Sequence, residues 1–169
     1  MHVVPYDSNW PSLFARERIL VKEVVGRWVE SIEHVGSTAI YGLDAKPVVD
    51  LIVWLRAMYD AGSCVEPLTN LGYSYWVEGA EPHHRLFVRF ANPERTARTH
   101  NLHLVAAGGR YWKEHLLFRD YLRDHPETAT EYVRLKYELA DRHRSDREAY
   151  TTAKTDFVSR IIRRASGTS

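Results

Sequence analysis

The segment that most constrains the fold is the apolar run at residues 48–54, which contains a single carboxylate, Asp50. Valine, isoleucine and tryptophan at this density are typical of a buried strand. A lone carboxylate inside such a strand is costly to bury unless it is paired or binds a cation. The run therefore predicts a central strand, with Asp50 either in an ion pair with an arginine or at a functional site.

Helical and extended patterns follow one another along the rest of the chain. Strands are predicted at 29–35, 73–77, 84–90 and 99–106, and helices at 10–27, 57–71, 110–123, 126–142 and from about 145 onward. No Gly/Ser/Pro linker divides the chain. The order predicts a single α+β domain over 1–169, with a mixed sheet of about five strands and an N-terminal helix in a core at 1–108. A three-helix extension at 109–169 packs on that core.

Composition indicates a folded, soluble protein. The chain has 169 residues, of which 44% are apolar and 27% charged, close to the average for globular proteins. The single cysteine, Cys64, excludes a disulfide framework and a Cys-rich zinc site, and we expect it to be buried. The start of the chain lacks a signal peptide pattern, and no apolar run approaches the length of a membrane span. We therefore expect a cytoplasmic protein without membrane partners.

A turn before the central strand has the features of an anion site. Gly36 permits close approach of a ligand, Ser37 and Thr38 supply hydroxyl groups, and the backbone amides that follow them are free to form a concave anion site. Lys46 adds a positive charge, and twelve residues (38–49) separate Ser37 from Asp50. An ordinary turn or helix cap is the alternative interpretation of the Gly-Ser-Thr triplet alone.

These features belong to a set of five motifs that resembles the GrpB-like family of small bacterial proteins, which have the nucleotidyltransferase fold of the DNA polymerase β type. The motifs are HVGSTA at 34–39, KPVVD at 46–50, THNLHL at 99–104, FRDYLR at 118–123 and YTTAK at 150–154. The resemblance spans nearly the whole chain. It implies a mixed sheet with nucleotide-binding residues on one face, a Gly-Ser turn that holds a triphosphate, and carboxylates that hold two magnesium ions for transfer at the α-phosphate.

The sequence departs from that pattern at two positions. Ile52 stands where a second carboxylate is expected, two residues after Asp50 on the same face, and His103 stands where the last strand would supply a third. As an alternative to two-magnesium chemistry, Asp50 and His103 share one divalent cation, with His34 or His84 as a third ligand. Imidazole and carboxylate together favour manganese or zinc over magnesium.

Arginines complete the predicted anion site. Arg85 and Arg89 share one face of the 84–90 strand, and their guanidinium groups are suited to phosphate. Arg119 and Arg123 lie on one ridge of the 110–123 helix. The alternative for both helix arginines is pairing with nearby acids such as Asp120.

The preferred hypothesis is a protein that binds a nucleoside triphosphate or another phosphorylated small molecule, with nucleotidyl transfer at Asp50 and His103 if it is active. Phosphate contacts are assigned to Gly36, Ser37, Thr38, Lys46, Arg85 and Arg119, and metal contacts to Asp50, His103 and His34. A non-catalytic accessory module is one alternative, because related domains occur fused to dephospho-CoA kinase. A transition-metal hydrolase is the other. Nucleic-acid binding is disfavoured, because many acidic residues balance the basic residues in the second half of the chain and no known nucleic-acid-binding motif is present.

Overall fold

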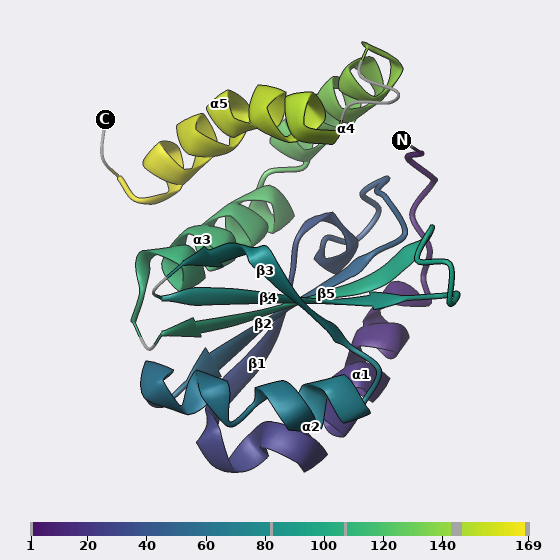
Figure 1. The fold of residues 1–169 in the computed structure, drawn as a ribbon. Helices are drawn as coiled ribbons and strands as arrows, with labels where there is room; N and C mark the ends of the chain where they lie inside the picture. The colour runs from purple at the N-terminus through teal and green to yellow at the C-terminus, as the bar shows by residue number, and fades with distance from the viewer. Residues whose placement is uncertain (1, 82, 107, 143–146, 168–169) are drawn as a thin grey trace.

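A five-stranded sheet forms the middle layer of the protein, and helices cover both of its faces (Figure 1). The computed structural model describes residues 2–81, 83–106, 108–142 and 147–167. The strands are β1 (Val29–Val35), β2 (Val49–Leu55), β3 (Ser74–Glu81), β4 (His84–Phe90) and β5 (Arg98–Ala106). The helices are α1 (Trp10–Val25), α2 (Val65–Asn70), α3 (Arg110–Asp124), α4 (Pro126–Arg142) and α5 (Arg147–Ala165). In Figure 1, α1 and α2 lie below the sheet, α3 lies above it, and α4 and α5 form a further layer on top.

The sheet is mixed, as predicted, and its strand order is β1-β2-β5-β4-β3. Only β2 and β5 run parallel, while the β1–β2, β4–β5 and β3–β4 pairs are antiparallel. The register sets Asp50 beside Asn101 and Ile52 beside His103. The two central strands therefore carry the two segments that the sequence marks as candidate sites.

The main core lies between the sheet and the lower helices. Side chains alternate between the two faces of a strand, and the lower face is made of fully buried residues: Leu51, Val53, Phe87, Leu102 and Leu104. Each side chain of this size contributes about 1.5–3 kcal/mol when it leaves water. This apolar face holds α1 and α2 against the sheet and keeps the opposite face in a fixed position for a site.

The upper layers have their own apolar clusters. Val35, Ile52 and Val105 on the upper face of the sheet pack against Trp112 of α3. Above them, α3, α4 and α5 share a second cluster with the loop after β1; its buried members are Ile40, Leu43, Phe118, Leu122, Tyr132, Phe157 and Ile161. The helical extension is thus anchored to the loop that carries the predicted anion site. In the described ranges, no helix combines the length and apolarity needed to cross a membrane.

The predicted helix at 57–71 is wrong in extent. The segment contains a short 3-10 helix at Met58–Gly62 and then the six-residue α2. Pro67 has no N–H and is tolerated only in the first turn of a helix, which fixes the start of α2 at Val65. Cys64, immediately before α2, is fully buried as predicted, and burial raises the pKa of its thiol to about 11. The predicted strand at 73–77 is longer than expected and continues as β3 to Glu81.

Candidate functional site

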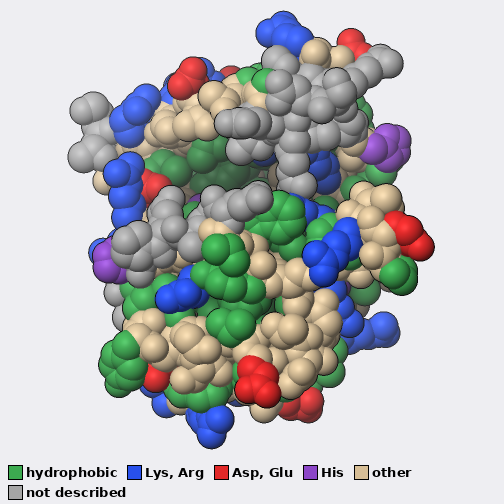
Figure 2. All heavy atoms as spheres, in the orientation of Figure 1, with side chains coloured by type: hydrophobic (Ala, Val, Ile, Leu, Met, Phe, Trp, Pro, Cys, Tyr) green, Lys and Arg blue, Asp and Glu red, His purple; other side chains and the backbone are tan. Residues whose placement is uncertain are grey.

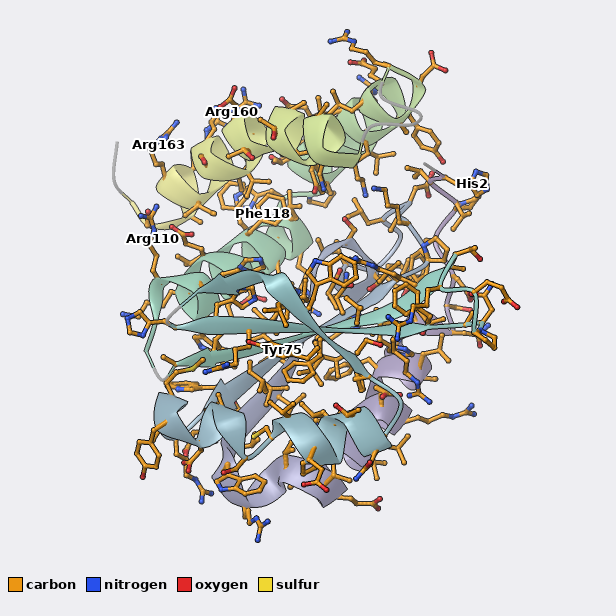
Figure 3. All side chains as sticks on the ribbon, viewed as in Figure 1. His2, Tyr75, Arg110, Phe118, Arg160 and Arg163 are labelled. Carbon is orange, nitrogen blue, oxygen red and sulfur yellow. The ribbon has the colours of Figure 1, made fainter. Side chains whose placement is uncertain are left out.

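A cavity of about 420 Å³ lies between the upper face of the sheet and the helical extension. The sheet contributes Asp50, Asn101 and His103, and the helices α3, α4 and α5 form the opposite wall. Figure 2 shows the surface hollowed between the helical layer and the sheet, with hydrophobic side chains inside. Phe118 lies on the side of α3 that faces α5 (Figure 3) and lines the cavity. The volume is in the range of small-molecule sites.

The Gly-Ser turn forms one end of this cavity. Gly36 has a positive φ of 71°, and Ser37 begins a 3-10 helix that ends at Ala39. A β-carbon at Gly36 would lie 2.4 Å from Oδ2 of Asp50, so glycine is required for both conformation and space. The Asp50 Oδ1 atom accepts a hydrogen bond of 2.7 Å from Nδ2 of Asn101. The turn, the β2 carboxylate and the β5 amide therefore form one packed unit, which the sequence spacing anticipated for Gly36, Ser37 and Asp50.

Thr38 lines the cavity, but its hydroxyl group is already engaged. Its Oγ1 donates to the backbone oxygen of Val48 over 3.3 Å and lies 3.0 Å from Nε2 of His34. The contact with His34 corrects a prediction, because His34 lies on the opposite face of the sheet from Asp50. The His34 ring stacks on Phe14 of α1 with a centroid distance of 4.7 Å. Burial, with the charges of Arg123 and Arg119, lowers the pKa of His34 to about 4. His34 is thus a buried, neutral residue that supports Thr38, and it cannot join Asp50 around a metal.

His103 lies on the same cavity wall as Asp50, as predicted, within a group of aromatic rings. Its Nδ1 atom is 2.9 Å from Nε2 of His84 and 2.9 Å from the hydroxyl group of Tyr111. The Tyr111 ring stacks between His84 and His115, with centroid distances of 4.3 Å and 4.1 Å. Burial, with the nearby His84 and His115, lowers the pKa of His103 well below its ordinary value, and burial also lowers the pKa of His115. His103 therefore presents a neutral imidazole to the cavity.

Three lysines line the cavity, and each comes from a different segment: Lys46 from the loop before β2, Lys136 from α4 and Lys154 from α5. Lys46 was predicted for this site. Lys154 appears in the sequence only as part of the family motif at 150–154, of which the Tyr150 side chain lies outside the described residues. Lys136 was missed, although its spacing of four from the buried Tyr132 places both residues on one face of the helix.

The Lys136 side chain is only 2% exposed. Its Nζ atom donates to the backbone oxygen of Asp44 and lies 4.8 Å from the centroid of the Tyr132 ring. Burial, with the charges of Lys154 and Lys46, lowers the pKa of Lys136 to about 7, against the opposing effect of Asp44. The Tyr132 hydroxyl group in turn hydrogen bonds with Ser37, and burial raises the pKa of Tyr132 to about 12. The α4 helix thus links the buried lysine to the Gly-Ser turn.

The two predicted arginines do not reach the cavity. Arg85 donates from Nη1 to the hydroxyl group of Tyr75 over 3.0 Å, and Tyr75 lies between the sheet and α2 (Figure 3). Arg119 donates to Glu33 over 3.0 Å, to the backbone oxygen of His34 over 2.9 Å and to Asp120 over 2.7 Å. Arg85 therefore serves the lower face of the sheet, and Arg119 joins α3 to the end of β1. The alternative of pairing with acids is the correct one for Arg119.

The donor set of the cavity does not fit a two-metal centre. Two carboxylates line it among the residues that the structure describes, Asp50 from β2 and Glu114 from α3, and the latter accepts a hydrogen bond from Arg110. Ile52, at the position of the expected second carboxylate, is fully buried against α3. Among residues 2–81, 83–106, 108–142 and 147–167, no group of three His, Cys, Asp or Glu side chains is arranged to hold a metal ion. Metal-dependent steps are therefore not assigned to this site.

Solved structures with the same architecture support the comparison with nucleotidyltransferases. The conserved protein GrpB from Enterococcus faecalis superposes with a TM-score of 0.88 at 29% identity, over 97% of this chain and 96% of that chain. The Cid1 poly(U) polymerase, in a structure with MgGTP bound, superposes with a TM-score of 0.59 at 12% identity, over 89% of this chain and 50% of that one. The second likeness shows the fold alone, and it confirms that the fold is nucleotidyltransferase-like.

Sequence relatives lead to the same family. A UPF0157 protein of Pseudomonas aeruginosa is 41% identical over 167 residues, which cover 98% of this chain and 67% of that protein. The glutamate-rich protein GrpB of Alkalihalophilus pseudofirmus is 36% identical over 165 residues, which cover 95% of this chain and 92% of that protein. A dephospho-CoA kinase of Mycolicibacterium paratuberculosis is 29% identical, and the chain spans about half of its length, 46%. The pattern of the GrpB protein family matches residues 1–164, and the chain therefore belongs to the GrpB family.

Proposed function

We propose that the protein binds a nucleoside triphosphate, or another phosphorylated small molecule, in the cavity between the sheet and the helical extension. The observation that carries this proposal is the convergence of Lys46, Lys136 and Lys154 on one cavity that also contains the Gly36–Ser37 turn. Lysine side chains from three separate segments raise the positive potential of a cavity. A cavity of this kind attracts an anion that carries several negative charges.

The fold supports a nucleotide as the anion. Cid1 structures with the same fold are described with MgGTP and with the UTP analogue UMPNPP bound. The apolar side chains Phe118, Val158 and Ile162 line the cavity together with the rings of Tyr111 and His115. A ligand with a charged phosphate end and a flat or apolar body matches a cavity of this composition.

We assign binding rather than nucleotidyl transfer. Transfer in this fold class is expected to need carboxylates that hold two metal ions, and the described cavity offers Asp50 with Ile52 at the next same-face position. Asp50 instead fixes the Gly36 turn, and His103 contributes a neutral polar surface to the wall. The transition-metal hydrolase alternative is not supported either. His34 lies on the other face, and in the part of the chain that the structure describes His84 does not complete a group of three side chains arranged to hold a metal ion with Asp50 and His103. An accessory role accords with the dephospho-CoA kinase relative, in which a related segment accompanies a kinase.

Calorimetric titration tests the proposal. ATP, GTP, UTP and CTP are titrated into the protein with EDTA and, separately, with magnesium. Lys154→Met is expected to weaken the affinity at least tenfold, because it removes one of the three positive charges. Lys113→Met, at an exposed lysine of α3 outside the cavity, is the matched control and is expected to change affinity less than twofold. Absence of saturable binding by every nucleotide under both conditions would contradict the proposal.

A further inference from the structure

The environment of Lys136 is unusual for an ammonium group. The side chain is almost completely buried, and the acceptor at its Nζ atom is a neutral backbone carbonyl, that of Asp44. The carboxylate of Asp44 is committed to other donors: Oδ1 accepts from the backbone N–H of Tyr6 over 3.2 Å, and Oδ2 accepts from the hydroxyl group of Tyr137 over 2.9 Å. A buried charge that lacks a directly bonded counter-charge favours its neutral form.

The other charged groups around the cavity are lysines and acidic residues that come from different elements. Lys46 and Lys154 share the cavity with Lys136, and their charges disfavour a third cation there. Acidic groups line it from the sheet and from α3. Among the described residues, the titratable side chains that face Lys136 or share its cavity are Asp44, Lys46, Asp50, His103, Tyr111, Glu114, His115, Tyr132, Tyr137 and Lys154. Among them Asp44 acts on Lys136 in the opposite direction, by favouring its charged form.

We propose that Lys136 takes up a proton when phosphate groups enter the cavity, and that this coupling makes the site select a polyphosphate chain over a single phosphate. The inference deepens the proposed function and depends on it. Free amine and solvent proton give the ammonium form, so the step needs no other reactant. The lysine is then a specificity-determining residue, because it becomes a full binding partner only for a ligand with enough negative charge to hold it protonated.

The physical reason lies in the number of charges. Each added cation in the cavity raises the energy of the other lysine ammonium groups. One phosphate group carries at most two negative charges near neutral pH and offsets this repulsion less than a longer chain does. A chain of two or three phosphates carries more negative charge and is long enough to contact more than one lysine. We therefore expect the order of affinity to be tripolyphosphate, pyrophosphate, orthophosphate, with at least a tenfold difference between the first and the last.

Proton uptake distinguishes this coupling from general attraction between opposite charges. ATP is titrated by calorimetry at pH 8.5 in two buffers of different ionisation enthalpy. The terminal phosphate of ATP titrates well below this pH and is fully ionised, while the pKa of Lys136 near 7 leaves its amine largely neutral in the free protein. The wild-type protein is expected to take up about one proton per ligand bound. Binding without proton uptake would overturn the inference and leave the proposed function standing.

Two further measurements complete the test. Lys136→Arg keeps a positive charge at every pH in the experiment, since arginine does not deprotonate in proteins; its expected proton uptake on binding ATP is near zero. The wild-type affinity for ATP is also measured from pH 7.5 to 9, where a fall of nearly tenfold per pH unit is expected and where no second variant has to fold. An affinity independent of pH over this range would overturn the inference. Failure of all three phosphates and of nucleotides to bind would instead overturn the proposed function.

Discussion

Asp50 and Gly36 are in direct contact across the start of the central strand pair: a β-carbon on Gly36 would lie 2.4 Å from Oδ2 of Asp50. Val35 pairs with Asp50 in the antiparallel β1–β2 ladder, and the chain turns immediately after it. The Asp50 carboxylate, which is costly to bury in an apolar strand, therefore positions the turn. Its other oxygen, Oδ1, accepts a hydrogen bond from the side-chain amide of Asn101.

This contact predicts that Gly36→Ala disrupts both stability and binding. Gly36 has a φ of 71° and a ψ of −173°, a backbone region that essentially only glycine adopts. This conformation and the clash with Asp50 both disfavour alanine, so the free energy of unfolding is expected to fall by about 2–3 kcal/mol. Urea denaturation measures the loss, and calorimetry measures the expected loss of nucleotide affinity. Gly42→Ala separates the two causes, because Gly42 has a φ of 73° but nothing within 4 Å of an added β-carbon. Equal losses in the two variants would show that the contact with Asp50 is unimportant.

The burial of Lys136 predicts that removal of its ammonium group raises stability and weakens ligand binding. Lys136→Met removes an ammonium group that is costly to bury, so the free energy of unfolding is expected to rise by about 1–2 kcal/mol at pH 7. The pKa of Lys136 in the folded protein, about 7, lies below the ordinary lysine value of 10.5. The unfolded chain therefore binds the proton more strongly, and the gain from methionine is largest at pH 7 and below and shrinks as the pH rises toward 10.5.

Urea denaturation between pH 6.5 and 9.5 measures this gain, and the same samples are titrated with ATP, for which the variant is expected to bind at least tenfold more weakly. Lys113→Met serves again as the control at an exposed site. A variant that is less stable than the wild type at pH 7 would indicate that Lys136 stabilises the free protein, contrary to this account.

His34 predicts sensitivity to acid. Its folded-state pKa of about 4 lies below the ordinary value of 6.5, so the unfolded chain takes up a proton over this interval while the folded protein does not. Stability is therefore lost as the pH falls from 6.5 to 4. His34→Gln, which retains a donor for Thr38, is expected to reduce this loss by roughly 2 kcal/mol. Denaturant titrations at several pH values measure it, with His83→Gln at an exposed histidine as control. An unchanged acid slope in His34→Gln would contradict the assignment.

The lower face of the sheet contains a second polar feature whose role we predict to be structural. Glu17 of α1 is buried and accepts hydrogen bonds from Nη1 of Arg89, at 2.7 Å and 2.8 Å, and from the hydroxyl group of Tyr73 at 2.9 Å. Arg89→Met leaves the Glu17 carboxylate buried beside Tyr73 and His100, and a loss of about 3 kcal/mol is expected.

The exposed Arg56–Glu30 pair, at 3.4 Å, offers a comparison. Arg56→Met is expected to cost less than about 1 kcal/mol, since ion pairs in water contribute little. Nucleotide affinity is expected to be unchanged in both variants, because neither arginine lines the cavity. Loss of binding in a folded Arg89→Met protein would place this feature in the site.

Much of the sheet could be predicted, because strand periodicity is a local property. The predicted bounds of β1 and β4 agree with the structure, β5 begins one residue earlier than predicted, and β2 is shifted by one residue at each end. Periodicity also correctly placed Arg85 and Arg89 on one face. It could not show that this face packs on α1 and α2, because the face that a strand turns toward a cavity depends on its neighbours. The same limit applies to His34, which lies one residue before Val35 and therefore on the face opposite Asp50.

The site was only partly predictable for a related reason. Gly36, Ser37, Lys46 and Asp50 lie within a short stretch, so spacing alone brought them together. Lys136 and Lys154 lie 90 and 108 residues after Lys46 in the chain. Only the packing of α4 and α5 on the loop at Ile40 and Leu43 brings them to the same cavity. The predicted phosphate contact of Arg119 was wrong, because the sequence does not distinguish an arginine beside a cleft from an arginine in an ion pair.

A titration of ¹⁵N-labelled protein with ATP, followed by two-dimensional NMR, tests most directly whether the three lysines and the Gly-Ser turn form a ligand site. The account predicts saturable shifts in the backbone amides of Gly36, Ser37 and Lys154 and in residues along the cavity face of α4. It also predicts that these shifts saturate only at an ATP concentration at least tenfold higher in Lys154→Met. Shifts confined to α1, α2 or β3, or none at ATP concentrations in the millimolar range, would contradict it.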